Sequence, residues 1–330
     1  MKVLVTGGAG YIGSHACKAL ASAGHVPVVF DNLRTGHRWA VQWGPMVHGD
    51  ICDTNAVRKA IKEHDIDAVM HFAALAYVGE SVRQPGLYYA ANVGGLVSVL
   101  DAMVSCDVDR IIFSSTCATY GIPESLPITE DSERAPINPY GHSKLMCEQV
   151  LIDHATAHGI GSIALRYFNA AGADAAGDIG EFHDPETHLI PLVLEAAADG
   201  DKTITVLGDD YDTPDGTCVR DYIHVTDLAD AHVSALERCA PGQAEHFNLG
   251  TGTGASVREI INAAEEVTGR KIAVEVGERR PGDPPILVAN AARAREALGF
   301  APRHSEIRNV IETAWQWMEK MPAGNQPRMR

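Results

Sequence analysis

The sequence predicts an α/β protein, built as a doubly wound parallel sheet with a smaller C-terminal α/β part. Short apolar runs alternate with helical stretches through the first half of the chain, and this rhythm breaks after about Asn169. Strands that are apolar on both faces are typical of a parallel sheet covered by helices. The 330 residues are enough for two domains, or for one large domain with a smaller one built onto it.

Six strands are expected in the first half, where short apolar runs are bounded by Gly, Asp or Asn. They cover residues 2–6, 26–31, 46–50, 68–73, 110–115 and 162–167. Helical patterns separate them at residues 13–23, 54–63, 86–106 and 140–158. Gly24 and Gly159 follow the first and the last of these helices, where glycine commonly ends a helix.

The second half is less regular, and residues 170–185 and 279–285 are expected to be loops. Helices are predicted at 189–199, 257–268 and 305–321, strands at 203–207, 246–249 and 271–276, and a strand followed by a helix at 221–238. We therefore expect a first domain of residues 1–169, to which 220–249 return, and a second domain of 170–219 and 250–330. The residues after Pro322 are expected to form a frayed tail.

The composition excludes several classes of partner. Lys and Arg number 27 against 43 Asp and Glu, so the formal net charge is −16. Nucleic acids and anionic membranes need a basic face, so neither is expected as a partner. No segment approaches the roughly 18 apolar residues of a membrane span, and no signal peptide is expected. The seven cysteines form no CxxC pair and indicate a cytoplasmic protein with reduced thiols.

A glycine-rich turn follows the first strand, in the segment VLVTGGAGYIG at residues 3–13. Glycines let the backbone approach a pyrophosphate, and the helix that follows offers free N–H groups. Asp31 ends the next strand, where a carboxylate can accept hydrogen bonds from ribose hydroxyls and repel a 2′-phosphate. The pattern predicts a Rossmann-type NAD site. Two glycine triplets fit, one starting at Gly7 and one at Gly8, and the sequence leaves open which one contacts phosphate.

Tyr140 and Lys144 lie four residues apart in YGHSK, at the start of a predicted helix, so they share one face. Lowering the pKa of a tyrosine by about 3 units takes roughly 4 kcal/mol. A nearby ammonium and an oxidised nicotinamide could together supply this in a water-poor pocket. Tyr140 is therefore a candidate base for a sugar hydroxyl. Thr116 ends a predicted strand, where ligands of such sheets bind, and could hydrogen-bond the reacting oxygen.

Several motifs together resemble a known family. TGGAGYIG, HFAA at 71–74, FSSTCATYG at 113–121 and YGHSK are similar to the extended short-chain dehydrogenase/reductases. RYFNAAGA at 166–173, DGTCVRDYIHVTDLADAH at 215–232 and NLGTGTG at 248–254 narrow the resemblance to the UDP-glucose (UDP-galactose) 4-epimerases. The resemblance covers nearly the whole chain.

The resemblance implies epimerisation at C4 of a UDP-sugar, with NAD kept bound and a transient 4-keto sugar. Tyr140 would take the C4 hydroxyl proton while hydride leaves C4. Thr116 would bond that oxygen, and Lys144 would hold the nicotinamide ribose and lower the pKa of Tyr140. A homodimer is also implied, joined through helices near residues 87–106 and 140–158.

The resemblance further implies two sets of binding residues. The set for NAD is Gly7, Gly10, Tyr11, Ile12, Gly13, Asp31, Asn32, Asp50, Ile51, Phe72, Ala73, Ala74, Asn92, Tyr140, Lys144 and Phe168. The set for the UDP-sugar is Thr116, Tyr140, Asn169, Leu189, Arg220, Arg280 and Asp283. A guanidinium fork matches phosphate oxygens, which suits the two arginines to the diphosphate.

The sequence departs from the family at four positions. Ala76 stands where a lysine near the pyrophosphate is common, Gly94 replaces a frequent asparagine, and His142 replaces a frequent lysine. Leu287 stands where the family often has Tyr or Cys and gates N-acetyl sugars. The bulk of Leu287 is therefore expected to disfavour UDP-N-acetylhexosamines.

Four other functions are considered. A 4,6-dehydratase would have an acidic pair after Thr116, where this chain has Cys117-Ala118. An exchanging reductase would need external nicotinamide, and a non-catalytic NAD sensor would not need the Tyr–Lys pair. A UDP-xylose/UDP-arabinose 4-epimerase stays open. No metal is expected, because the spacing of His183 and His188 fits no standard ligand pair.

Overall fold

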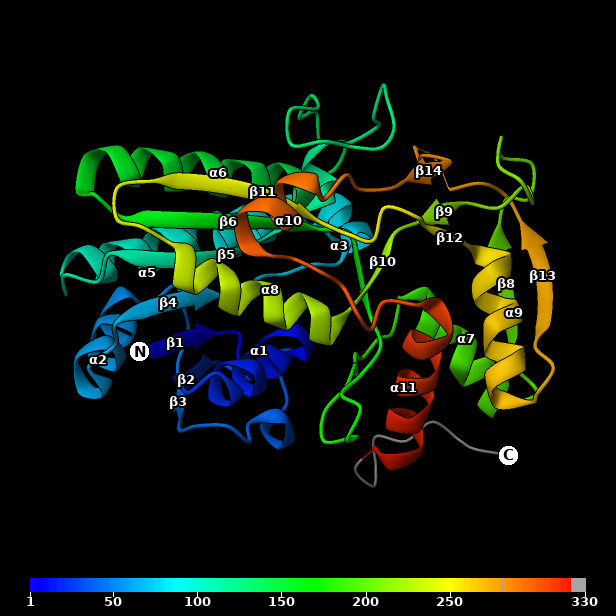
Figure 1. Cartoon of the computed structure of the whole chain (residues 1–330), viewed down its shortest axis with the longest axis horizontal. Coiled ribbons are helices and arrows are strands. Elements are labelled where there is room, and N and C mark those ends of the chain that lie inside the picture. Colours follow the sequence, from blue (N-terminus) through cyan, green and yellow to red (C-terminus); the bar gives the residue numbers. More distant parts are fainter. Residues whose placement is uncertain (281, 322–330) are drawn as a thin grey trace.

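A seven-stranded parallel sheet forms the frame of the protein (Figure 1). The computed structural model describes residues 1–280 and 282–321, so the predicted frayed tail lies outside it. The strand order is β11-β6-β5-β4-β1-β2-β3. These strands are β1 (Lys2–Thr6), β2 (Val26–Asp31), β3 (Met46–His48), β4 (Ala68–His71), β5 (Arg110–Thr116), β6 (Gly161–Tyr167) and β11 (Ala244–Leu249). The order runs outward in both directions from β1 and confirms the predicted doubly wound Rossmann-type sheet.

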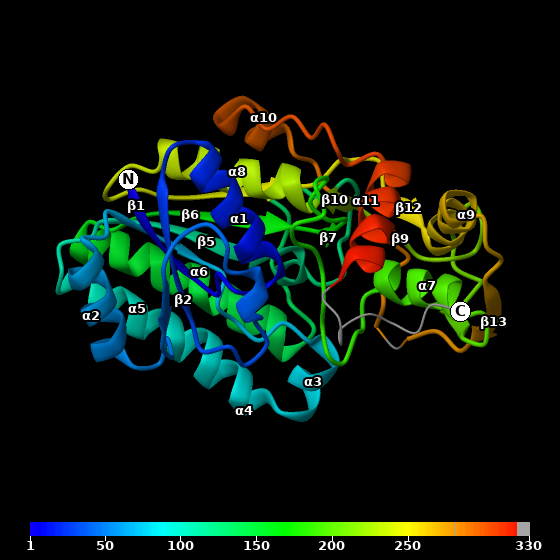
Figure 2. The same ribbon diagram turned by 90° about the horizontal axis from the view of Figure 1, so that it is seen from below.

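Helices cover both faces of this sheet, as Figure 2 shows. One face carries α1 (Tyr11–Ser22) and α8 (Val225–Arg238), which pack against each other. The other carries α2 (Thr54–His64), α5 (Gly95–Val104) and α6 (Pro139–His158). The strands between them are buried, which explains why their sequences are apolar without alternation.

A smaller mixed part lies at one end of the sheet (Figure 1). It contains the helices α7 (Leu189–Ala198), α9 (Val257–Thr268) and α11 (Ile307–Lys320) and the parallel pair β8 (Thr203–Leu207) and β13 (Ala273–Gly277). Its helices share a core of their own, which includes Val193, Ile260 and Trp317. This part corresponds to the smaller C-terminal α/β region predicted from the sequence.

Short strands join the two parts. In β7 (Asn169–Ala171) and β10 (Tyr222–His224) the chains run parallel, and the chain then enters α8 and returns to the main sheet as β11. In contrast, β9 (Val219–Arg220) pairs with β12 (Ala255–Ser256) and β14 (Ile286–Leu287). Arg220 therefore lies at the junction. The division into domains at residues 169, 219 and 249 stays a prediction.

The single helix predicted at 86–106 is present as a continuous helical segment over Pro85–Val104, but it contains a π-helical turn that was not predicted. The chain forms α3 (Val78–Arg83), α4 (Pro85–Tyr88), a π-helical turn at Tyr89–Gly94 and then α5. The glycine at the start of α5 reflects a close approach, because a Cβ on Gly95 would collide with the side chain of Ile51. The remaining short elements are the 3₁₀ turns Arg38–Ala40 and Cys117–Thr119 and helix α10 (Ala292–Leu298).

The same stretch also corrects the expectation about membrane spans. Pro85–Val104 is long and apolar enough to cross a membrane by length and composition, with a mean hydropathy of 1.4. Half of its most apolar window is buried inside the protein. Leu96, Leu100 and Met103 are fully buried in the core beneath α2 and α6. A buried core helix of a soluble protein passes the same test, so the criterion is weak evidence for a membrane span.

Buried histidines predict an acid-sensitive fold. Burial lowers the pKa of four of them from 6.5, to about 4 for His15, His224 and His232 and to about 3 for His71. Below pH 6.5 the unfolded chain therefore binds more protons than the folded one. The stability contributed by these neutral rings is fully present above pH 6.5 and is lost as the pH falls towards 4.

We expect the free energy of unfolding, measured by urea titration, to decrease steadily over that window. His232→Gln, which cannot be protonated, should reduce the slope, since each unit of pKa difference is worth about 1.4 kcal/mol. A wild-type stability that does not change between pH 6.5 and 5 would contradict this account.

Candidate active site

The glycine-rich turn packs tightly against the end of β4. Gly7 has a φ of 72°, and a Cβ there would lie 2.6 Å from the amide nitrogen of Ala73. A Cβ on Gly13 would collide with the carbonyl of Gly7. Gly10 is the N-cap of α1, and the nearest atom to a Cβ there would be 3.3 Å away. Gly7 and Gly13 are thus required by packing within the protein, while Gly10 leaves the start of α1 accessible to a phosphate.

Asp31 ties this turn to the end of β2. Its carboxylate is buried and accepts hydrogen bonds from the amides of Ala9, at 3.0 Å, and Leu33, at 2.8 Å. A carboxylate has about four acceptor positions, so two remain for the hydroxyls of a ribose. Next to it, Asn32 donates to Asp50 at 3.1 Å. The amide of Cys52 also bonds Asp50, and these bonds lower the pKa of the carboxyl.

Not all of the other predicted NAD residues offer a free polar group. Tyr11 donates its hydroxyl to the carbonyl of Gly172 at 2.6 Å, which links α1 to the smaller part. Asn92 is buried and bonds the backbone of Leu75 and the hydroxyl of Ser143. The structure therefore gives Asn92 a positioning role between α6 and the end of β4. The side chains of Ile12, Ile51, Phe72, Ala74 and Phe168 offer apolar surface.

The start of α6 is fixed by local signals. Asn138 caps the helix by accepting a hydrogen bond from the amide of Gly141 at 2.9 Å, and Pro139 occupies the first turn. A Cβ on Gly141 would lie 2.5 Å from the carbonyl of Ala118, so only glycine lets the helix approach the 3₁₀ turn after β5. This close approach places the hydroxyl of Tyr140 beside that of Thr116 at the end of β5, within reach of a hydrogen bond.

Lys144 lies one turn further along α6 and is fully enclosed. Its ammonium donates to the carbonyl of Ser114 at 2.8 Å and lies 4.8 Å from the ring centre of Phe113. The structure thus brings Thr116, Tyr140 and Lys144 to one strand end, but the ammonium contacts the strand and not the Tyr140 hydroxyl.

Without a ligand, this site does not show the predicted lowering of the Tyr140 pKa. Burial raises the pKa of Tyr140, and the hydrogen bond from Thr116 opposes this only in part. Burial also lowers the pKa of Lys144 to about 8. The role predicted for Tyr140 as a base therefore requires an additional positive charge nearby, such as an oxidised nicotinamide.

The predicted substrate residues lie at the junction of the two parts. Arg220 donates to Asp283 at 2.6 Å and to the carbonyl of Val219 at 2.7 Å. Leu189 is the first residue of α7, and the amide of Asn169 in β7 donates to the carbonyl of Asp221 at 2.9 Å. Arg280 is exposed on the loop before β14. The two parts of the chain thus each contribute candidates.

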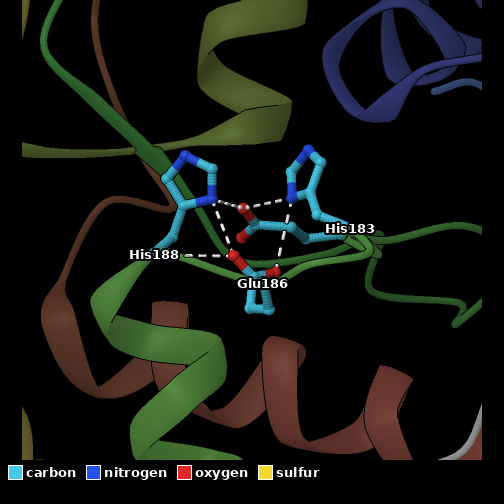
Figure 3. Close-up of side chains that lie close together, drawn as sticks. His183, Glu186 and His188 are labelled. Atoms are coloured by element: carbon cyan, nitrogen blue, oxygen red, sulfur yellow. Dashed lines mark hydrogen bonds and ion pairs between the residues drawn. The ribbon is translucent and has the colours of Figure 1, made fainter. Parts of the chain in front are cut away.

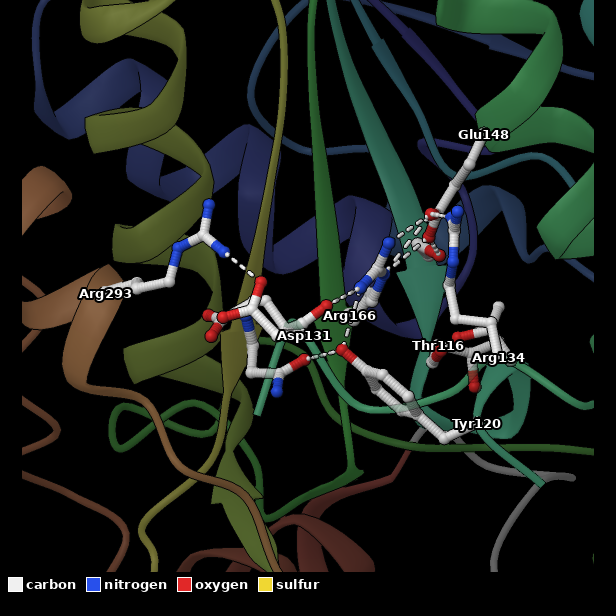
Figure 4. A network of polar contacts seen from close by, with 11 residues as sticks. Thr116, Tyr120, Asp131, Arg134, Glu148, Arg166 and Arg293 are labelled. Atoms are coloured by element: carbon white, nitrogen blue, oxygen red, sulfur yellow. Dashed lines mark hydrogen bonds and ion pairs between the residues drawn. The ribbon is translucent and has the colours of Figure 1, made fainter. Parts of the chain in front are cut away.

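A buried ion pair behind β5 was not predicted from the sequence (Figure 4). Glu148 of α6 and Arg166 of β6 are joined by three hydrogen bonds of 2.6–3.2 Å. Glu148 also accepts a bond from Ser115 at 2.6 Å, and Arg166 donates to Tyr120 at 2.8 Å. Burial raises the pKa of Glu148, but the bonds and charge of Arg166 outweigh this and lower it. The Glu–Arg pair holds α6 against β6, and the bond from Ser115 joins Glu148 to β5, next to Thr116.

Asp221 was missed as well. It is fully buried, and its carboxylate accepts bonds from Thr251, Gly252 and Ala289 at 2.6–3.0 Å. These contacts hold the NLGTGTG turn and the end of β14 around Arg220. The only sequence feature that could have indicated this role is the position of Asp221, an acidic residue between Arg220 and the strand Tyr222–His224.

Comparison with known proteins identifies the family. The family model described as "NAD dependent epimerase/dehydratase family" matches residues 3–250. The chain belongs to the NAD dependent epimerase/dehydratase family. It is 52% identical to the UDP-glucose 4-epimerase of Lactobacillus helveticus, over 98% of this chain and 99% of the relative.

Solved structures of the family share the fold. The UDP-glucose 4-epimerase of Brucella ovis in complex with NAD superposes with a TM-score of 0.92 at 53% identity, covering 95% of this chain and 97% of that one. The enzyme of Bifidobacterium longum in complex with NAD⁺ and UDP has a TM-score of 0.92 at 39% identity, covering 98% and 100%. The predicted resemblance is confirmed.

The site fits the cofactor of an NAD dependent epimerase/dehydratase family member. The open start of α1 at Gly10 suits a pyrophosphate, and the remaining acceptor positions of Asp31 suit a ribose. Asp31 also disfavours a 2′-phosphate by repulsion, which favours NAD over NADP.

Proposed function

We propose that this protein is a UDP-glucose 4-epimerase that interconverts UDP-glucose and UDP-galactose with NAD retained. The observation that carries the proposal is the contact of Tyr140 with Thr116 beside the buried Lys144, next to a glycine turn suited to a dinucleotide. The names of the relatives support the hexose reaction over the UDP-xylose/UDP-arabinose alternative.

In this proposal each side chain has one task. Tyr140 takes the proton of the sugar C4 hydroxyl and later returns it, and Thr116 keeps the reacting oxygen in line through its hydroxyl. Lys144 is anchored on Ser114, so its charge is held beside the strand end. The bound NAD supplies a hydride acceptor and donor for both half-reactions. Because nothing is oxidised or reduced overall, one retained cofactor is sufficient.

The UDP part is proposed to anchor the sugar while its 4-keto form turns. Arg220 and Arg280 would hold the diphosphate, with Asn169, Leu189 and Asp283 around it. In the structure, the carboxylate of Asp283 forms an ion pair with the guanidinium of Arg220. A diphosphate could share this fork, because a guanidinium has five N–H donors.

We also propose that the protein is a cytoplasmic homodimer. The seven cysteines are all free thiols, which suits a reducing compartment. Met146 and Ile152 on α6 and Val104 on α5 are exposed apolar side chains on the two helices predicted to meet a second copy. Sedimentation velocity of the purified protein tests the dimer, and a monomer at all concentrations would contradict it.

The deciding experiment uses purified protein, UDP-galactose and no added cofactor. Proton NMR should show conversion to UDP-glucose, and denaturation of the same sample should release about one NAD per chain. Bound NAD without conversion would point to UDP-pentoses, which would be assayed next. Absence of both conversion and bound nicotinamide would favour an exchanging reductase or a non-catalytic binding protein.

The position of Leu287 predicts sugar selectivity. It lies on β14 opposite Arg220 and packs against the cluster formed by Tyr120, Ile128 and Phe168. We expect wild-type protein to turn over UDP-N-acetylglucosamine much more slowly than UDP-glucose. Leu287→Ala should raise kcat/KM for UDP-N-acetylglucosamine relative to kcat/KM for UDP-glucose at least about tenfold. One methylene in an apolar pocket alone changes the discrimination between two substrates roughly 10–200-fold.

Ile286→Ala is the matched control, because its side chain leaves the opposite face of the same short strand. It should leave the substrate ratio unchanged. Comparable wild-type turnover of the two substrates would refute the role of Leu287.

A further inference from the structure

Four side chains converge just before α7, at the end of the loop predicted at 170–185 and in the residues that follow it. They are Glu181, His183, Glu186 and His188 (Figure 3). Each offers one ligand atom, and these four atoms lie within 4.8 Å of one another. The spacing of two, three and two residues fits no standard metal-binding motif, so this convergence was not predicted from the sequence.

Both imidazoles present the same nitrogen to both carboxylates. The Nδ1 atom of His183 lies 3.3 Å from an oxygen of Glu181 and 3.3 Å from one of Glu186. The Nδ1 atom of His188 lies 3.1 Å and 2.9 Å from oxygens of the same two carboxylates. A tetrahedral site with bonds of about 2.0–2.2 Å has ligand atoms roughly 3.3–3.6 Å apart. Glu181 faces both histidines with Oε1, whereas Glu186 faces His183 with Oε2 and His188 with Oε1. A tetrahedral site therefore requires small shifts of the side chains and a turn of the Glu186 carboxylate that brings one oxygen towards both nitrogens.

The cluster is held in place by contacts outside it. The backbone carbonyl of Glu181 accepts a hydrogen bond from the indole of Trp317 at 2.9 Å. One oxygen of Glu186 accepts bonds from the amides of Thr187 and His188 at 2.6 and 2.7 Å. The first three side chains are largely buried, and only His188 is about half exposed. Pre-ordered donors and an accessible edge are what a metal site with an entry path requires.

The negative charges of Glu181 and Glu186 can be balanced either by two protons on the histidines or by one divalent metal ion. With both imidazoles protonated, two positive charges face two carboxylates. A divalent ion on neutral imidazoles gives the same net charge, so it can replace two protons without leaving an uncompensated charge.

The cluster also lies beside the glycine turn. The ring of His183 meets those of Tyr11 and Tyr77 edge-on, at 6.4 and 6.2 Å between ring centres. After burial itself, the carboxylates of Glu181 and Glu186 are what raise the pKa of Tyr11. An ion bound here would therefore fix the segment before α7 against the turn that starts α1.

We propose that Glu181, His183, Glu186 and His188 bind one divalent transition-metal ion of the zinc class, in a tetrahedral site with two nitrogen and two oxygen ligands. Imidazole and carboxylate ligands in this geometry favour zinc or cobalt over magnesium and calcium, which take oxygen ligands in larger numbers. The ion joins the segment before α7 to the body of the protein and needs no role in the epimerase reaction.

The test uses full-length protein stripped with a chelator and titrated with Co²⁺. We expect one ion per chain and the intense visible absorption of tetrahedral cobalt, displaced by Zn²⁺, together with a rise in Tm on adding Zn²⁺. His183→Gln and His188→Gln should each weaken Co²⁺ binding by more than about 100-fold. Loss of a residue that only hydrogen-bonds a metal ligand typically weakens binding by roughly 10- to 100-fold, and loss of a ligand itself should cost more.

A second histidine pair provides the control. His154 and His158 lie one turn apart on α6, with ring centres 5.5 Å from each other, and could bind metal weakly. The double variant His154→Gln/His158→Gln should keep the tetrahedral spectrum and the stoichiometry. If wild-type protein binds no Co²⁺ at micromolar concentration, or binds it equally well without His183 and His188, the cluster holds ion pairs only and the proposal is overturned. Far-UV circular dichroism verifies that each variant is folded.

Discussion

Tyr140→Phe is expected to reduce kcat by about 10²–10⁴-fold, the usual contribution of a general acid–base group. The substitution removes only the hydroxyl that bonds Thr116, while the ring remains enclosed at the start of α6. Since this hydroxyl is proposed to exchange a proton with the sugar and not to bind it, KM for UDP-galactose should change little. The measurement is the steady-state rate of UDP-glucose formation, with released NAD assayed on the same sample.

Tyr89→Phe is the control for this variant, because Tyr89 lies in the π-helical turn and outside the proposed site. It should keep both activity and bound NAD. If Tyr140→Phe retained near wild-type kcat, Tyr140 could not be the base. If it lost NAD as well as activity, the defect would be in cofactor binding and the assignment of Tyr140 as the base would lose its support.

The parts of the fold that the sequence predicted are those with local causes. The strand β1, the glycine turn and α1 are each specified by consecutive residues. Similarly, Gly159 caps the end of α6 with a φ of 71°, a conformation that glycine adopts without help from distant residues. The contact of Tyr140 with Thr116 was also within reach. One residue starts a helix and the other ends a strand of the same parallel sheet, and such ends meet at one edge.

The parts that the sequence missed depend on contacts between distant residues. Glu148 and Arg166 are 18 positions apart. In the sequence each resembles an ordinary surface charge, and only the packing of α6 on the sheet brings them together. Asp221 meets its partners 30 and 68 positions later. In the His–Glu cluster the residues are close in sequence, but a loop without helical or strand periodicity gives no rule for where its side chains point.

The largest expected effect on stability comes from Arg166→Met. Arg166 is fully buried, and the substitution leaves the carboxylate of Glu148 without its main partner inside the protein. Breaking a buried pair in this way typically costs about 3–5 kcal/mol. Arg134 also contacts Glu148, at 3.1 Å, but it is partly exposed and can compensate only in part. Urea unfolding of the two proteins measures the difference.

Two further variants separate the buried charge from the lost packing. Arg166→Met combined with Glu148→Gln should recover part of the stability, because no uncompensated charge remains. Arg238→Met removes an arginine from the exposed pair with Glu245, which is joined by two hydrogen bonds, and should cost less than about 1 kcal/mol. Glu148 lies one turn after Lys144 and accepts a bond from Ser115, beside Thr116. Arg166→Met alone should therefore also lower kcat more than Arg238→Met does. Equal effects of the two arginine substitutions would show that burial of the Glu148–Arg166 pair contributes nothing to stability.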